Sequence, residues 1–323
     1  MEYGTIPGIN KPVSRLLLGT MIITADEQER SNALLDAALA HGGNALDTAH
    51  VYAGGNSERA IGAWMEARGN RDEVVIVSKG CHPNRDRRRV SPHDLTSDLM
   101  DSLARLRTDY IDLYLLHRDD VDVPVSVIVD TLNEHHAAGR IHAFGGSNWT
   151  HTRLQEANEY AEAHGLVPMT ASSPNYGLAE QVLDPWGPGC VGIAGPTQRE
   201  AREWYAARGM PVLAYSSLGR GFFSGRISRE NFAETKSMLD RACLTAYCHE
   251  VNFKRLDRAH ELAKEKGCTV PQLVLAYILR SSMKVFPIVG AANEDEYVQN
   301  LVAFDVPLSE AERRWLDLET EER

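Results

Sequence analysis

The sequence predicts a single α/β barrel of eight parallel strands, with residues 1–323 forming one domain. Short β-rich runs alternate with helical stretches about eight times along the chain, which is the pattern of repeated strand–helix units. Most of these runs are continuously apolar, as expected for parallel strands that are covered on both faces. Because no linker or shift in composition divides the chain, repeated right-handed crossovers favour closure into a (β/α)8 barrel.

The predicted strands are short apolar segments that end in polar residues or glycine. The first of them is RLLLG, and the longest is IDLYLLHR. Runs of this length, bounded by turn-forming residues, are typical of strands rather than of helices. The eight strands are expected at residues 15–19, 44–49, 74–80, 111–118, 141–148, 169–173, 211–217 and 285–290.

Helix signals lie between these strands. Ser91 can cap a helix that begins at Pro92, and its leucines repeat on one face. Glycines follow the ends of two other helices and fit the usual helix stop. Helices are therefore expected at residues 57–69, 92–106 and 124–139.

Two stretches interrupt the regular alternation. Residues 183–196 follow the sixth strand, and residues 216–236 follow the seventh. Loops at the carboxyl ends of barrel strands build the active site in barrel enzymes, so these extended loops are expected to contact substrate and cofactor. Their glycine and proline content is equally compatible with passive turns.

The composition excludes several classes of partner. The chain has 34 basic and 45 acidic residues, a net charge of −11, and no basic stripe, which argues against nucleic-acid binding. No apolar stretch is long enough for a membrane span and no leader pattern is present, so a cytoplasmic protein without membrane contact is expected. Five cysteines suit free thiols in a reducing compartment. Cys243, Cys248 and His249 lack a second ligand pair, so no metal site is expected.

Four chemically complementary residues fall at the carboxyl ends of three successive predicted strands. They are Asp47 with Tyr52 just beyond it, Lys79 and His117. A tyrosine has an ordinary pKa near 10, so we expect a nearby cation such as Lys79 to lower the pKa of Tyr52 if it protonates an alkoxide. Asp47 would hold the ammonium, and a neutral His117 would orient a substrate carbonyl.

Two long segments resemble signatures of the aldo-keto reductase family. The segment LDTAHVYAGGNSERAIGAW is similar to the signature around the family's catalytic Asp and Tyr, and DLMDSLARLRTDYIDLYLLHR is similar to its second signature. The resemblance covers nearly the whole chain. It implies reduction of an aldehyde or ketone by NAD(P)H, with Asp47, Tyr52, Lys79 and His117 as the catalytic tetrad.

The same resemblance implies which residues bind the cofactor. Three sets would surround the nicotinamide and its ribose, the pyrophosphate and the adenosine, and Tyr215 would stack on the nicotinamide ring. The first set is Gly19, Thr20, Met21, Asp47, Ser147, Asn148, Ser173 and Tyr215. The second is Ser216, Ser217, Leu218, Gly219, Arg220, Gly221 and Arg226. The third is Gly290, Ala291, Ala292, Asn293, Glu296 and Asn300.

The sequence departs from the family pattern at two cofactor positions. Ser173 stands where the family often has a glutamine that helps hold the carboxamide. The adenosine segment carries Glu294, Asp295 and Glu296 where many NADPH-dependent relatives have a basic residue. Carboxylates repel a 2′-phosphate and can accept a hydrogen bond from a ribose hydroxyl, so the sequence slightly favours use of NADH. The choice between NADH and NADPH stays open.

The sequence indicates less about the substrate than about the fold or the cofactor. His50, Trp149 and Trp186 follow motif residues or lie in the sixth loop, and they are candidates for the substrate wall. Packing roles explain them equally well. A sugar or polyol carbonyl is one interpretation of the polar loops. A non-catalytic, cofactor-sensing accessory subunit and a phosphate-binding barrel isomerase or lyase are the alternative functions. The oligomeric state is not predicted.

Overall fold

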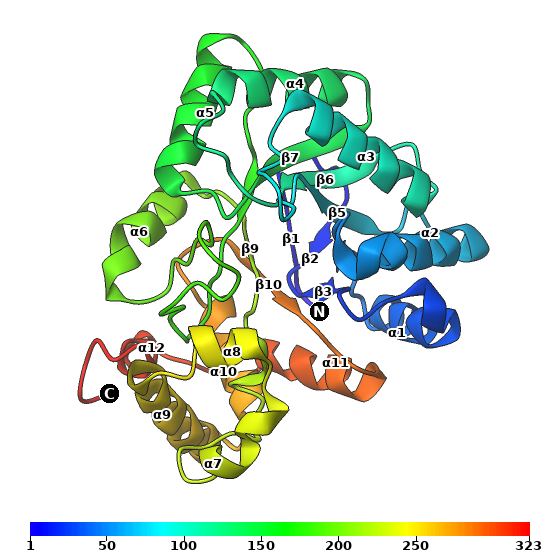
Figure 1. Cartoon of the computed structure of the whole chain (residues 1–323). Helices are drawn as coiled ribbons and strands as arrows, with labels where there is room; N and C mark the ends of the chain where they lie inside the picture. The colour runs from blue at the N-terminus through cyan, green and yellow to red at the C-terminus, as the bar shows by residue number, and fades with distance from the viewer. The chain divides into compact units, whose positions relative to one another are not determined.

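The computed structural model describes residues 1–323 and contains eight parallel strands in the order of a closed barrel (Figure 1). This confirms the predicted fold class. Residue contacts divide the chain into two compact units, the first formed by residues 1–173 and 290–297 and the second by residues 174–289 and 298–323. The strands are β3 (Leu17–Gly19), β4 (Ala45–Asp47), β5 (Val75–Gly80), β6 (Ile111–Leu116), β7 (Ile141–Ser147), β8 (Ala171–Ser173), β9 (Val212–Ala214) and β10 (Val285–Val289).

The first unit places its chemically active residues at the ends of neighbouring strands. Strands β3 to β8 follow one another in parallel, with Asp47 opposite Val77 and Lys79 opposite Leu115. β4, β5 and β6 are entirely buried, as their apolar sequences predict. Because parallel strands end at the same edge, the residues that follow β4, β5 and β6 lie at one rim.

Amphipathic helices cover these strands. Ser91 caps α3 by accepting a hydrogen bond from the Asp94 amide, and Pro92 begins the helix, as predicted. The leucine face of α3 is buried, which fixes the helix against the sheet. The helices of this unit are α1 (Gln28–Ala40), α2 (Asn56–Arg68), α3 (Pro92–Leu106), α4 (Val125–Ala137) and α5 (His151–Ala163), and α11 (Glu294–Leu301) begins in it.

The second unit contains the β9–β10 pair and most of the later helices. Val212 pairs with Val285 in parallel register. Residues 183–196 form no regular helix, whereas residues 216–236 include a short 3-10 helix and α7. The helices are α6 (Arg199–Arg208), α7 (Phe232–Thr235), α8 (Arg241–Ala246), α9 (Glu250–Lys266), α10 (Val270–Leu279) and α12 (Glu310–Leu316). No helix combines the length and apolar character needed to cross a membrane.

Candidate active site

Asp47 and Lys79 form a buried ion pair at the ends of the adjacent strands β4 and β5. Oδ1 of Asp47 lies 2.7 Å from Nζ of Lys79, and both residues are almost completely buried. The ammonium also donates a hydrogen bond to the carbonyl oxygen of Thr48 at 2.8 Å. Each charge would be unpaired in the interior without the other, so the two residues depend on one another.

The Tyr52 hydroxyl lies next to this pair. Nζ of Lys79 donates to the Tyr52 hydroxyl oxygen at 3.4 Å. The chain turns sharply after the tyrosine, because Ala53, Gly54 and Gly55 have φ angles of 48°, 62° and 90°. Glycine adopts such values without strain, whereas Ala53 adopts them at some cost. This turn leads the chain into α2, and Tyr52 itself lies beside the carboxyl ends of the strands.

His117 completes the group. Its ring meets that of Tyr52 edge-on, with 5.9 Å between the centroids, and its carbonyl oxygen accepts hydrogen bonds from the Asn148 amide group at 3.2 Å and from Arg118 at 2.9 Å. Burial, followed by the positive charge of Lys79, holds the pKa of His117 well below its usual 6.5. The imidazole is therefore neutral at neutral pH, and its Nδ1 has no hydrogen-bond partner.

The pKa of Tyr52 differs from the sequence expectation. Burial raises the pKa of Tyr52 above its ordinary value of 10.0, and the Lys79 charge lowers it only in part. The expected net lowering is thus wrong for this structure, because desolvation of the phenolate outweighs the ammonium. Burial alone would lower the pKa of Lys79, but the Asp47 charge and the Tyr52 hydroxyl raise it above 10.5. Both groups therefore keep their protons at neutral pH.

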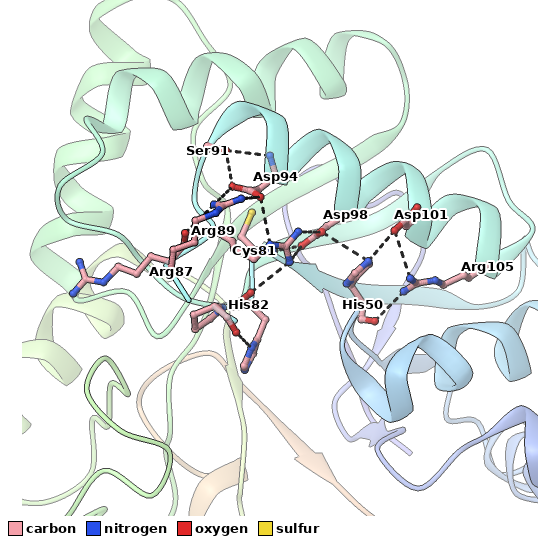
Figure 2. Close-up of polar contacts among 12 residues, drawn as sticks. His50, Cys81, His82, Arg87, Arg89, Ser91, Asp94, Asp98, Asp101 and Arg105 are labelled. Carbon is pink, nitrogen blue, oxygen red and sulfur yellow. Dashed lines mark hydrogen bonds and ion pairs between the residues drawn. The ribbon is translucent and has the colours of Figure 1, made fainter. Parts of the chain in front are cut away.

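One face of α3 contacts the segment that leads into Tyr52, and Figure 2 shows Asp98, Asp101 and Arg105 of this helix directed toward His50. Arg105 donates to the carbonyl oxygen of His50 at 2.9 Å and pairs with the buried carboxylate of Glu58 at 3.3 Å. Its guanidinium also lies against Gly55, where a Cβ would come within 2.7 Å of it. Nε2 of His50 is 3.2 Å from the Asp101 carboxylate. The ring of His50, a candidate for the substrate wall, is thus directed toward α3.

The same helix face holds the loop after β5. Asp98 accepts a hydrogen bond from the amide of Cys81 at 2.8 Å and pairs with Arg89 at 2.5 Å. Cys81 has a φ of 62°, which turns the chain so that His82 meets the ring of His117 at 4.8 Å. Figure 2 shows the His82 ring pointing away from α3. His82 is a neighbour of the tetrad that the sequence analysis missed.

We expect Arg105 to position Tyr52. Replacing Arg105 with methionine removes the donor to the His50 carbonyl and leaves Glu58 without its guanidinium. The turn should then hold the hydroxyl less accurately, and displacements of about 1 Å can cost roughly 100-fold in rate. The expected result is a kcat lowered by roughly 10- to 100-fold with little change in cofactor affinity, measured by steady-state kinetics and fluorescence titration. Arg105→Lys should restore part of the lost kcat.

Arg71 offers a matched control for this prediction. It also pairs with a fully buried carboxylate, that of Asp112 at 2.9 Å, and its side chain is 16% exposed against 17% for Arg105. Arg71 precedes the start of β5, whereas Lys79 lies near the carboxyl end of that strand. Arg71→Met should lower stability without lowering kcat. Equal losses of kcat in the two variants would show that Arg105 has only a structural role.

Several predicted cofactor residues of the first unit form a polar group at the strand ends. The Thr20 hydroxyl donates to the Asp47 carbonyl oxygen at 3.0 Å. The Ser147 hydroxyl donates to the carbonyl oxygen of Ser173 at 2.9 Å, and the Asn148 amide group donates to the Ser147 hydroxyl at 3.2 Å. All five residues are buried. Gly19 ends β3 just before them, and Met21 is 55% exposed.

Two acidic residues of the adenosine segment, Glu294 and Glu296, have structural partners in this unit. The Glu296 carboxylate accepts a hydrogen bond from the Ala292 amide at 2.8 Å, and the Asn293 side chain accepts one from the Glu296 amide at 2.9 Å. These bonds cap the start of α11. Glu294 pairs with His41 at 2.8 Å. The cap uses only one carboxylate oxygen of Glu296, and the other has no hydrogen-bond partner in the chain. Gly290 and Ala291 connect β10 to this cap.

The second unit contains the predicted pyrophosphate segment. Arg220 pairs with Asp240 through Nε at 3.0 Å, and its guanidinium carbon lies 5.2 Å from the centre of the Trp186 ring. The Trp186 ring is in turn 6.3 Å from that of Tyr215. The remaining predicted residues of this unit range from buried to exposed: Ser216, Ser217, Leu218, Gly219, Gly221, Arg226 and Asn300.

The two tryptophans proposed for the substrate wall have different surroundings. Trp149 is completely buried and packs on Gly146, where a Cβ would lie 2.4 Å from the indole. Trp186 is 46% exposed; in the second unit its ring is tilted by 54° against that of Tyr215, and the Arg220 guanidinium lies over it. Trp149 therefore packs inside the first unit in this structure, whereas Trp186 presents an accessible ring.

The model of the aldo/keto reductase family matches residues 15–317 of the chain. The chain belongs to the aldo/keto reductase family. Its members are NAD(P)H-dependent oxidoreductases, so the family assigns this chain to carbonyl reduction in general terms. The predicted family and enzyme class are confirmed, whereas the roles of individual residues stay predictions.

Two relatives and one solved structure are similar to the chain over most of its length. The chain is 29% identical to norsolorinic acid reductase stcV of Emericella nidulans, over 93% of this chain and 76% of the relative. It is 29% identical to Protein tas of Escherichia coli, over 96% of this chain and 95% of that protein. The crystal structure of a thermostable aldo-keto reductase in complex with the inhibitor epalrestat superposes with a TM-score of 0.75 at 24% identity, covering 99% of this chain and all of that one. This structure supports the fold.

Proposed function

We propose that this aldo/keto reductase converts an aldehyde or ketone into an alcohol with Tyr52 as the proton donor. The observation that carries the proposal is the buried Asp47–Lys79 pair with the Tyr52 hydroxyl 3.4 Å from its ammonium. After Tyr52 releases its proton, Lys79 stabilises the phenolate, and Asp47 holds Lys79 in place. A neutral His117 can donate a hydrogen bond to the carbonyl oxygen and orient it for reaction.

The residues of the first unit fit a nicotinamide cofactor. A carboxamide both donates and accepts hydrogen bonds. At the end of β7 the Ser147 hydroxyl donates to the Ser173 carbonyl oxygen, and the Asn148 amide group donates to the His117 carbonyl oxygen and to the Ser147 hydroxyl. These groups would exchange some of these bonds for bonds to the carboxamide. Gly19 and Thr20, at the end of β3, would face the ribose. When bound, NADH or NADPH supplies the hydride. The shorter Ser173 stands where the family often has a glutamine, so Ser147 and Asn148 would make most of the contacts with the carboxamide.

We further propose that Glu296 disfavours the 2′-phosphate of NADPH. Glutamine can keep the cap bond to the Ala292 amide while removing the charge, so Glu296→Gln changes the electrostatics alone. One charge at about 4 Å in water contributes roughly 1 kcal/mol, or about fivefold in affinity. The KM for NADPH should therefore fall about fivefold, and the KM for NADH should change little.

A matched control is available in α12. Glu312 accepts a hydrogen bond from the Ser309 amide at 2.7 Å in a capping box, much as Glu296 caps α11. Glu312→Gln should leave both KM values unchanged. If Glu296→Gln alters neither value, or alters both equally, Glu296 does not discriminate between the cofactors.

The function is tested by following oxidation of NADPH and NADH with a panel of carbonyl compounds. The panel includes hydroxylated sugar-type aldehydes, because a sugar or polyol carbonyl is our proposed substrate class, together with aromatic ketones and norsolorinic acid. Turnover with an alcohol product supports the enzyme. Tight cofactor binding without turnover on any compound would instead indicate a cofactor-sensing accessory subunit, and a lack of cofactor binding would contradict both.

A further inference from the structure

His82 lies beside the tetrad in the loop that follows β5. Its ring meets the ring of His117 edge-on, with 4.8 Å between the centroids and 84° between the planes. His117 in turn contacts the ring of Tyr52. His82 is half-buried, and the roles proposed for the tetrad do not use it. A second imidazole therefore lies next to the one that is expected to meet the substrate carbonyl.

Hydrogen bonds to α3 and to the loop itself fix the backbone at this position. The Cys81 amide donates to the Asp98 carboxylate at 2.8 Å, and the positive φ of Cys81 turns the chain here. Arg89 donates to the His82 carbonyl oxygen at 3.5 Å and to the Asp98 carboxylate at 3.1 Å. Figure 2 shows this network between the loop and α3, with the His82 ring directed away from it. The network therefore holds the imidazole in a defined place.

The hydrogen bond made by the His82 ring determines which nitrogen can meet a substrate. Nδ1 lies 2.8 Å from the carbonyl oxygen of Pro83. A carbonyl oxygen only accepts hydrogen bonds, so Nδ1 carries the hydrogen, and Nε2 of the neutral ring is an acceptor. Burial lowers the pKa of His82 below its usual 6.5, and the bond to Pro83 opposes this effect only in part, so the ring is neutral at neutral pH. Nε2 has no hydrogen-bond partner in the chain.

The charges around the two imidazoles favour an uncharged donor as the partner of Nε2. Besides burial, the charges of Lys79 and Arg118 lower the pKa of His117. The charges of Arg118 and Arg89 also lower the pKa of His82. These cations would repel an ammonium group, whereas a hydroxyl group can donate a hydrogen bond without carrying a charge.

We propose that His82 is a specificity-determining residue whose Nε2 accepts a hydrogen bond from a hydroxyl group on the carbon next to the reacting carbonyl. The substrate class is then an α-hydroxy aldehyde or an α-hydroxy ketone. Because the rings of His82 and His117 are adjacent, a substrate whose carbonyl oxygen meets His117 brings the hydroxyl of the neighbouring carbon to His82. This inference rests on the proposed function, and it assigns one contact of the proposed sugar-type substrate.

Two aldehydes that differ by one hydroxyl group test the proposal. The values of kcat/KM are measured for lactaldehyde and propanal with the parent and with His82→Phe. The ratio of the two values should fall about fivefold in the variant, because one hydrogen bond of ordinary net strength is lost. Both proteins act on the same two compounds, so differences in intrinsic reactivity cancel. An equal loss with both aldehydes would show that His82 only supports His117, and it would overturn the proposal, as would an unchanged ratio.

Two further variants serve as controls. His82→Gln keeps an acceptor oxygen on a side chain of similar reach, so it should retain part of the preference for lactaldehyde. His164 is the matched histidine, because its Nδ1 also lies 2.8 Å from a carbonyl oxygen, that of Tyr160, and its ring also packs on an aromatic ring. It stands at the exposed end of α5, so His164→Phe should leave the ratio unchanged. A fall of the same size in His164→Phe would contradict a specific role for His82.

The tautomer is tested separately by ¹⁵N NMR of the full chain labelled at its histidines. The signals of His82 are those that are missing from His82→Gln. We expect a hydrogen on Nδ1 and none on Nε2 at neutral pH, and a hydrogen on Nε2 would overturn the proposal. A lack of turnover with both aldehydes would contradict the proposed function itself, whereas turnover with a ratio that does not depend on His82 would contradict only this inference.

Discussion

Replacing Tyr52 with phenylalanine should remove most carbonyl reduction and leave cofactor binding intact. The substitution deletes only the hydroxyl that lies 3.4 Å from the Lys79 ammonium. Positioned proton donors typically contribute roughly 10²- to 10⁴-fold to rate, and we expect kcat to fall within that range. Steady-state kinetics gives the loss, and fluorescence titration with NADPH and NADH shows whether cofactor affinity is retained.

Tyr114 provides the control for this substitution. It is a buried tyrosine on β6, and its hydroxyl has no hydrogen-bond partner. Tyr114→Phe removes the same atom without touching the tetrad, so kcat should stay near that of the parent. Near-normal turnover by Tyr52→Phe would rule out Tyr52 as the proton donor.

Replacing Lys79 with methionine should have two effects that can be separated. The pKa of Tyr52 should rise further because the charge that lowers it is gone, and kcat should fall by roughly 10²-fold or more. Asp47 would also be left buried without its counter-charge, which costs about 3–5 kcal/mol of stability. Kinetics measures the first effect, and urea denaturation measures the second.

The double variant Asp47→Asn with Lys79→Met distinguishes these effects. It removes both charges, so it should recover much of the lost stability and none of the lost activity. If turnover returned together with stability, the role of Lys79 would be structural.

In the parent, the pKa values of Tyr52 and Lys79 both lie above their ordinary values, so both protons are present at neutral pH. Reduction should therefore be lost only as the pH rises past about 10.

The strands could be predicted from sequence because buried parallel strands are continuously apolar. All eight predicted runs contain a strand of the structure. The hairpin formed by β1 (Tyr3–Gly4) and β2 (Val13–Ser14) could not be predicted, because two residues are too few to show a periodic pattern. The helix over residues 92–106 was predictable from its cap and its leucine face.

The tetrad was recognisable because each member ends or follows a strand, whereas its supporting residues were not. Asp94, Asp98, Asp101 and Arg105 have helical spacing and mark a polar face of α3, a signal that was present in the sequence. His50 is 51 residues from its partner Asp101, and Arg89 lies in the loop nine residues before Asp98, so neither contact follows from the helical spacing and both required the structure. The net rise in the pKa of Tyr52 depends on burial, which the residue types alone do not give.

Deuterium transfer tests the proposed reaction most directly. NADPH and NADH carrying two deuterium atoms at C4 of the reduced nicotinamide ring are incubated with the parent enzyme and the carbonyl panel, and the alcohol product is analysed by mass spectrometry. We predict one deuterium on the former carbonyl carbon in the parent and almost no product with Tyr52→Phe. An alcohol without deuterium, or equal product from both proteins, would contradict hydride transfer assisted by Tyr52.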